Sequence, residues 1–99
     1  MVRIRATAKL MENFRTVIDD SRTHSVVCDL EPAMGGQDTG PTALELAIMG
    51  LAGCAATIFA DVAEQSKIGI TKLEVVAEAE KPPDSPKLSG VKLKLHVSA

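Results

Sequence analysis

The sequence predicts an α+β domain in which three antiparallel strands precede one long helix and two further strands follow it. Three observations indicate this order: alternating apolar and polar residues at both ends of the chain, a Gly- and Pro-rich stretch at residues 31–41, and a nearly uncharged segment in the middle. Alternation with a period of two is typical of half-buried strands, and a long apolar segment with boundary signals is typical of a buried helix. The 99 residues are expected to form one domain, residues 1–99.

The first thirty residues are expected to form a meander of three strands. Short polar side chains at the second turn bond their own backbone, which favours a tight reversal there. Val26, Cys28 and Leu30 lie on the same, apolar face of the last strand. Cys28 is therefore interpreted as a small core residue. The expected segments are a strand at 2–10, a turn at 11–13, a strand at 14–18, a turn at 19–21 and a strand at 24–30.

The helix is expected to begin at Thr42 and to run for about 25 residues, or roughly 37 Å. Thr42 and Glu45 have the Thr-x-x-Glu spacing of a capping box, in which each side chain accepts a hydrogen bond from a backbone N–H group of the other residue. Lys67 is expected in the last turn and Gly69 just beyond it, as stop signals. The uncharged run at 46–60 is shorter than the roughly 20 residues that span a bilayer. It therefore indicates a buried helix and no membrane association.

Two strands are expected after the helix, at 73–79 and 91–97, with a polar connector at 81–86 between them. Five strands of one small chain cannot cover a helix that is apolar nearly all round. Two Phe and no Trp or Tyr leave the core thin, because aromatic side chains supply the largest buried areas. A second chain is therefore expected to complete the burial.

Composition excludes several classes of function. The net charge is −2, and no basic patch with interspersed aromatic residues suggests nucleic acid as a partner. The first residues lack the apolar core of a secretory signal, and two cysteines in such a protein favour a reducing cytoplasm and free thiols. His24 and His96 have no cysteine or carboxylate at ligand spacing, so no metal is expected.

The segment 35–54 carries the most specific motif of the chain. Its sequence is Gly-Gly-Gln-Asp-Thr-Gly-Pro-Thr-Ala-Leu-Glu-Leu-Ala-Ile-Met-Gly-Leu-Ala-Gly-Cys. It resembles the signature of the OsmC/Ohr family, bacterial and archaeal proteins of osmotic and organic-hydroperoxide stress, and the similarity continues through 63–80. The resemblance implies intertwined homodimers with two active sites at the interface. It also implies thiol-dependent reduction of organic hydroperoxides by small dithiols or lipoyl proteins, with no bound metal, flavin or other cofactor.

The same resemblance implies roles for individual residues. Cys54 falls on the cysteine that attacks the peroxide, and Glu45 falls on the carboxylate that helps to hold the active-site arginine. Arg22 lies in the region where that arginine is found, and Arg15 is the alternative. A guanidinium suits this role because it stays charged and offers a planar fork of donors.

The residues themselves leave structural interpretations open. Cys54 stands between the small residues Gly53 and Ala55, which a close helix crossing also requires. Glu45 can serve the capping box alone. Nine residues of helix place Glu45 and Cys54 about 13–14 Å apart along the axis and on opposite sides of it. If both serve one site, Glu45 must therefore come from the partner subunit.

The chain departs from the family pattern at its end. The resolving cysteine of the family belongs to a helix after the last strand, and here the sequence stops at Ala99; Cys28 does not match that position. A sulfenic acid on Cys54 would then need an external thiol, or would over-oxidise. The sequence therefore also allows a non-catalytic dimeric stress or binding protein, or a shortened or partial chain.

Overall fold

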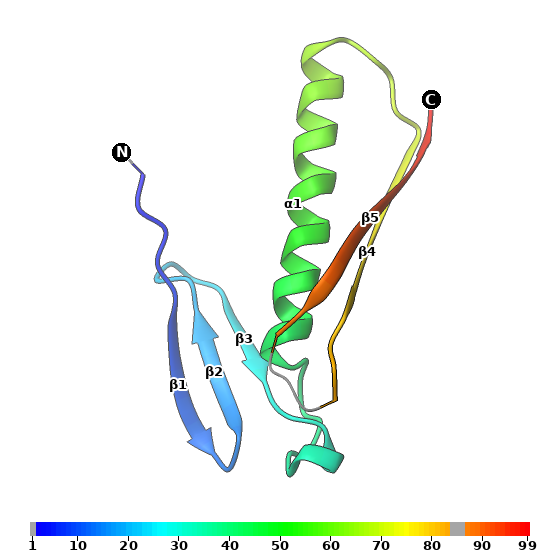
Figure 1. Cartoon of the computed structure of the whole chain (residues 1–99). Helices are drawn as coiled ribbons and strands as arrows, with labels where there is room; N and C mark the ends of the chain where they lie inside the picture. Colours follow the sequence, from blue (N-terminus) through cyan, green and yellow to red (C-terminus); the bar gives the residue numbers. More distant parts are fainter. Residues whose placement is uncertain (1, 84–86) are drawn as a thin grey trace. The chain divides into compact units, whose positions relative to one another are not determined.

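The computed structural model describes residues 2–83 and 87–99. Its elements follow the order β-β-β-α-β-β that the sequence predicted, with the 3-10 helix η1 (Pro32–Met34) before the long helix (Figure 1). The chain divides into two compact units, Met1–Leu46 and Ala47–Ala99. The single domain over 1–99 stays a prediction.

The first unit holds an antiparallel sheet in which β2 (Arg15–Asp19) lies between β1 (Thr7–Glu12) and β3 (Ser25–Cys28). The expected start of the first strand, at residue 2, is wrong. Thr7 is the first residue of β1 with a partner, because it stands opposite Asp19 at the end of β2. Residues 2–6 do not pair with β2, so their alternation of apolar and polar side chains does not produce a strand.

The other boundaries of the meander also differ from the sequence-based expectation: the first strand ends at Glu12 rather than at residue 10, and Asp19 of the expected second turn belongs to β2. The first turn lies at Asn13 and Phe14 rather than at 11–13, since Asn13 adopts a left-handed conformation (φ 52°) that asparagine tolerates. The third strand stops at Cys28 rather than at residue 30. Asp29 leaves the ladder and binds the loop that follows.

Helix α1 (Ala43–Gln65) is continuous over 23 residues. The predicted capping box is confirmed at its start. The Thr42 backbone N–H donates to Glu45 Oε1 at 2.9 Å, and the Glu45 backbone N–H donates to Thr42 Oγ1 at 3.1 Å. Two N–H groups at the helix start are thus satisfied by the chain itself.

The end of α1 differs from the prediction. Lys67 lies beyond the helix in the left-handed conformation (φ 57°), the position that glycine usually takes. Its backbone N–H donates to the Glu64 carbonyl at 3.0 Å, and the Ile68 N–H donates to the Ala63 carbonyl at 2.8 Å. These two bonds form a Schellman motif, which ends the helix two residues before Lys67.

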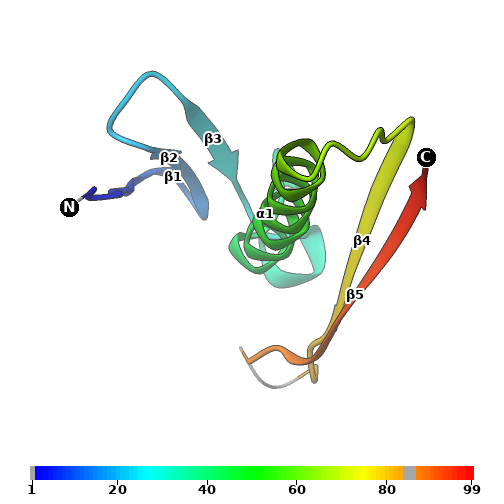
Figure 2. The ribbon, with the colours of Figure 1, turned by 90° about the horizontal axis from the view of Figure 1, so that it is seen from above.

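The second unit ends in a hairpin of β4 (Lys72–Glu80) and β5 (Ser89–Ser98). The strands run side by side along their whole length in Figure 2, in register from the Lys72–Ser98 pair to the Glu78–Lys92 pair. The strands expected at 73–79 and 91–97 are present, with limits within one residue of the prediction except at the start of β5, which lies two residues earlier. Residues 84–86 of the predicted connector lie outside the described part of the chain.

Few side chains are buried in the protomer. Among the described residues, only Cys28, Asp29 and Ala63 are buried. Met49, Ile58 and Val62 of α1 are each more than half exposed. The alternating apolar residues of β5 are 41–49% exposed: Val91, Leu93, Leu95 and Val97. The burial of α1 that the sequence predicts therefore depends on a second chain, and it stays a prediction.

By length and composition alone, α1 is apolar enough to cross a membrane, with a mean hydropathy of 1.9 over its best 18 residues. Among the described helices it is the one that meets this criterion. A core helix shared between two chains has the same properties, because it too is apolar on more than one face. The expectation of no membrane association stays a prediction.

Candidate functional site

Cys54 lies in the middle of α1, and its side chain is exposed. Glycines stand one and four residues before it, and a Cβ added at Gly53 or Gly50 would meet no atom within 4 Å. The surface around the sulfur is thus open in the protomer. An accessible thiol with small neighbours can be reached by a peroxide, and it can also be covered closely by a second chain.

Glu45 lies on the first turn of α1, where its Oε1 completes the capping box. This confirms the structural role that the sequence left open. Because α1 is continuous, Glu45 and Cys54 do not share a face of the helix. A joint role still requires Glu45 of one protomer and Cys54 of another.

Arg22 lies in the turn between β2 and β3. Its backbone N–H donates to Asp20 Oδ1 at 2.8 Å, and the same carboxylate approaches His24 Nδ1 at 2.7 Å. The hydrogen bond from His24, followed by that from the Arg22 backbone, lowers the pKa of Asp20 to about 2. These bonds order the turn backbone. Arg22 and Cys54 belong to different compact units, and their pairing stays a prediction.

Arg15, the alternative arginine, is held by side chains of the loop before α1. Its Nε donates to Thr39 Oγ1 at 3.0 Å, and its Nη2 donates to Gln37 Oε1 at 2.7 Å. Its Nη1 lies 3.9 Å from a carboxylate oxygen of the exposed Glu12. Arg15 thus has a defined position, with neutral groups on one edge of its guanidinium.

Asp29 is a buried carboxylate that the sequence-based reasoning did not identify. Its Oδ2 accepts hydrogen bonds from Thr39 Oγ1 (2.7 Å), the Thr39 N–H (3.2 Å) and the Gln37 N–H (3.3 Å), and its Oδ1 accepts one from the Leu30 N–H (2.7 Å). The Thr39 hydroxyl bond is the largest influence that lowers the pKa of Asp29, to about 2. The available signal was an acidic residue at the end of an apolar strand, directly before a Gly-rich segment.

Cys28 is the second thiol of the chain, and it is only 4% exposed at the end of β3. Its interpretation as a core residue is confirmed. Burial raises the pKa of the Cys28 thiol, which disfavours the reactive thiolate.

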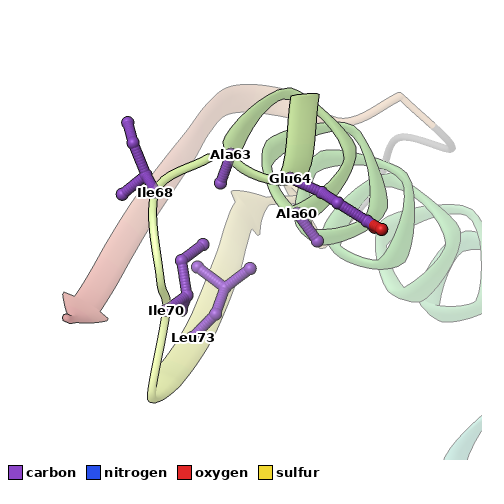
Figure 3. Close-up of a pocket in the computed structure, with 6 residues that line it drawn as sticks. All are labelled: Ala60, Ala63, Glu64, Ile68, Ile70 and Leu73. Atoms are coloured by element: carbon purple, nitrogen blue, oxygen red, sulfur yellow. The ribbon is translucent and has the colours of Figure 1, made fainter. Parts of the chain in front are cut away.

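A shallow apolar pocket of about 350 Å³ lies where the end of α1 meets the start of β4. Figure 3 shows the Glu64 side chain pointing away from Ile70 and Leu73. None of the predicted site residues lines this pocket, which is formed by Ala60, Ala63, Glu64, Ile68, Ile70 and Leu73. Across residues 2–83 and 87–99, no three His, Cys, Asp or Glu side chains are grouped to hold a metal ion.

Comparison with known families relates the chain to a described family. The model of the family described as OsmC-like protein matches residues 36–99, which is more than half of the chain. Glu45 and Cys54 lie inside this range, whereas Arg15, Arg22 and Asp29 precede it. No curated protein matches the chain in sequence.

Solved structures share the fold. One is a protein described as an organic hydroperoxide resistance protein of Vibrio cholerae O1 biovar eltor, with captopril bound in one of its active sites. It is 21% identical, with a TM-score of 0.73 over 100% of this chain and 69% of that one. Another is an organic hydroperoxide resistance protein OsmC of Legionella pneumophila, described as a predicted redox protein. It is 22% identical, with a TM-score of 0.72 over 100% of this chain and 73% of that one.

Proposed function

Since the chain belongs to the OsmC-like protein family, we propose that it reduces organic hydroperoxides with Cys54 as the attacking thiol. The observation that carries the proposal is the exposed Cys54 on α1, inside the range that the family model matches. The hydroperoxide resistance proteins that share its fold support the substrate class. The other thiol, Cys28, is buried and disfavoured as a thiolate.

The proposed first step transfers one oxygen from the peroxide to sulfur. The Cys54 thiolate attacks the terminal oxygen of ROOH, the O–O bond breaks, and the OH group remains on sulfur as a sulfenic acid. The alkoxide RO⁻ leaves and takes up a proton to give the alcohol ROH. Sulfur is oxidised by two electrons, and the peroxide is reduced by two.

The proposed second step uses an external thiol or dithiol, such as a lipoyl group. One thiol displaces water from the sulfenic acid and forms a mixed disulfide with Cys54. A second thiol of the reductant then attacks this mixed disulfide. The attack restores the Cys54 thiol and converts the reductant to its disulfide form. The reaction needs no metal or other cofactor, and a reducing cytoplasm is the compartment that maintains it.

A guanidinium near the sulfur favours the thiolate that attacks the peroxide. Arg22 is the candidate from the sequence, Arg15 is the alternative, and Glu45 of the partner subunit would orient the arginine. An intertwined homodimer would cover the apolar residues of α1 and β5 that are exposed in one protomer. Large exposed apolar patches are rare in monomeric proteins and usually mark an interaction surface. We assign these surfaces to a second copy of the chain, because a helix shared between two chains is apolar on more than one face.

Consumption of cumene hydroperoxide with dithiothreitol as reductant tests the proposal. The purified protein is expected to turn over the peroxide, and Cys54→Ser is expected to abolish turnover. Cys28→Ser is the matched control, because it removes the other thiol, and it is expected to retain activity. Turnover that survives Cys54→Ser would contradict the assignment. An inactive natural protein would favour the non-catalytic alternative.

A further inference from the structure

We propose that Thr57 binds the hydroperoxide beside Cys54, by accepting a hydrogen bond from the O–H group of the peroxide. The inference rests on the proposed function, because it concerns the reaction of the Cys54 sulfur, and it adds a second residue that touches the substrate. Thr57 and Cys54 belong to one continuous helix, α1, so their spacing is fixed by that helix alone.

Thr57 is a polar exception in the middle of α1. From Leu46 to Ala60 it is the one residue whose side chain carries an oxygen or a nitrogen atom. Threonine is a weaker helix former than alanine, and a hydroxyl is costly on an apolar surface unless it has a hydrogen-bond partner. A residue that departs in this way from its surroundings is typical of a functional site.

Thr57 lies on the same side of α1 as Cys54. Residues three or four apart are neighbours on the surface of a helix. The neighbours of Cys54 at this spacing are Gly50, Leu51, Thr57 and Ile58, and Thr57 alone among them has a polar side chain. A helical side chain leans over the turn that precedes it, so Thr57 lies over the turn that carries Cys54.

The hydrogen bond of the Thr57 hydroxyl determines what the hydroxyl can offer to a ligand. Its Oγ1 donates to the Gly53 carbonyl at 2.9 Å. A hydroxyl has one proton and two acceptor lone pairs. Within residues 2–83 and 87–99 this hydroxyl makes no other hydrogen bond. Because the backbone takes its proton, Oγ1 meets an incoming group as an acceptor.

An acceptor at this place suits an organic hydroperoxide. The single O–H group of ROOH is on the terminal oxygen, which is the atom that sulfur attacks. A hydrogen bond to Thr57 Oγ1 therefore selects this oxygen and directs the R group away from it. The other large neighbours, Leu51 and Ile58, are 39% and 58% exposed and are apolar, so their side chains give the O–H group no acceptor. A donor buried without a partner is costly.

Thr57 keeps this role throughout the oxidation without exchanging a proton with the substrate. The Cys54 thiolate forms a bond to the terminal oxygen, the O–O bond breaks, and its electron pair leaves with RO⁻, which takes a proton from water. The transferred oxygen keeps its hydrogen. The O–H group that the peroxide directs at Oγ1 thus becomes the O–H group of the sulfenic acid, and it donates to the same atom.

The test compares two reagents for Cys54 in rapid-quench experiments, with peptide mapping to follow the loss of the Cys54 thiol. Cumene hydroperoxide has an O–H donor, whereas methyl methanethiosulfonate reacts with the same thiolate and has no hydrogen-bond donor. Thr57→Val keeps the branched shape and removes the hydroxyl. It is expected to slow the peroxide reaction by about 10-fold to 100-fold and to leave the thiosulfonate reaction unchanged. Thr57→Ser, the matched control, keeps the hydroxyl and should retain the peroxide rate.

The two reagents distinguish substrate binding from a structural role. A change in the helix or in the ionisation of Cys54 would slow both reactions, because both need an accessible thiolate. Equal losses with the two reagents, an unchanged peroxide rate in Thr57→Val, or an equally slow Thr57→Ser would overturn the inference and leave the proposed function standing. A natural Cys54 that reacts with the peroxide no faster than free glutathione would overturn both.

Discussion

Asp29 and Cys54 are residues of opposite kinds. Asp29 is charged and buried, and its stability as an anion comes from four hydrogen bonds made by its own loop. Cys54 is a residue type that is usually buried, yet its side chain is exposed on α1. Each departs from the usual distribution of its residue type, which is typical of positions that serve a site.

The ionised state of Asp29 predicts a loss of stability in acid. Its pKa falls from the ordinary 3.8 to about 2 on folding. A lowered pKa contributes stability that is fully present above the unfolded value and is lost as the pH falls through the folded value. Thermal unfolding followed by circular dichroism should therefore show a steep loss of stability from pH 4 to pH 2, and Asp29→Asn should flatten it.

Asp20 provides the control for this prediction. Its pKa is also lowered to about 2, so Asp20→Asn should remove a separate part of the same acid dependence. Asp29→Asn is also expected to be less stable than the natural protein at neutral pH. An acid dependence that is unchanged in Asp29→Asn would show that its loop bonds contribute nothing to folding.

The sequence singled out Cys54 and Glu45 as candidate site residues and Cys28 as a core residue, but it gave no role to Asp29. The first three stand in a motif or in a clear strand pattern, so local spacing was sufficient. The role of Asp29 depends on Thr39, ten residues away, returning to it through a loop. Periodicity carries no information about such a return, because it describes regular elements only.

At the level of elements, the termini of α1 illustrate the same difference. The capping box lies within four residues and was predicted correctly. The helix end was expected at the glycine, yet the left-handed residue is Lys67. Strand limits were wrong for a related reason, since the start of β1 is set by the last residue of β2 that can pair with it.

Lys67 offers a direct test at this scale. A non-glycine residue in the left-handed region is strained, and glycine relieves this strain at a smaller cost in chain entropy. Lys67→Gly is therefore expected to raise the free energy of unfolding by about 0.5–1 kcal/mol. Urea unfolding measures this change in the free energy of unfolding. Lys67→Ala removes the same charge but keeps Cβ, and a comparable gain in that control would exclude the backbone explanation.

At the scale of the whole molecule, the main feature is the apolar surface that one protomer leaves exposed. Apolar residues of α1 and β5 are exposed in a chain that has few aromatic residues with which to build a core. The sequence predicted this need for a second chain from the apolar surface of the helix alone. It could not predict which residues a second copy would cover, because an interface depends on the surfaces of both partners.

Gly50 tests whether α1 is covered closely. In the isolated protomer a Cβ at Gly50 meets nothing within 4 Å, so alanine should stabilise the helix by about 1 kcal/mol. If a second copy packs there, the added methyl group should instead weaken the dimer by about 1–3 kcal/mol. We expect the second result. Sedimentation equilibrium of Gly50→Ala measures it, with Gly69→Ala as a control at an open position outside the helix.

The most direct measurement is the mass of the protein after one equivalent of cumene hydroperoxide without added thiol, followed by peptide mapping. The account predicts a gain of about 16 Da, one oxygen atom, on the peptide that carries Cys54, as a sulfenic acid. An unmodified Cys54, or an oxygen placed on Cys28 instead, would contradict it.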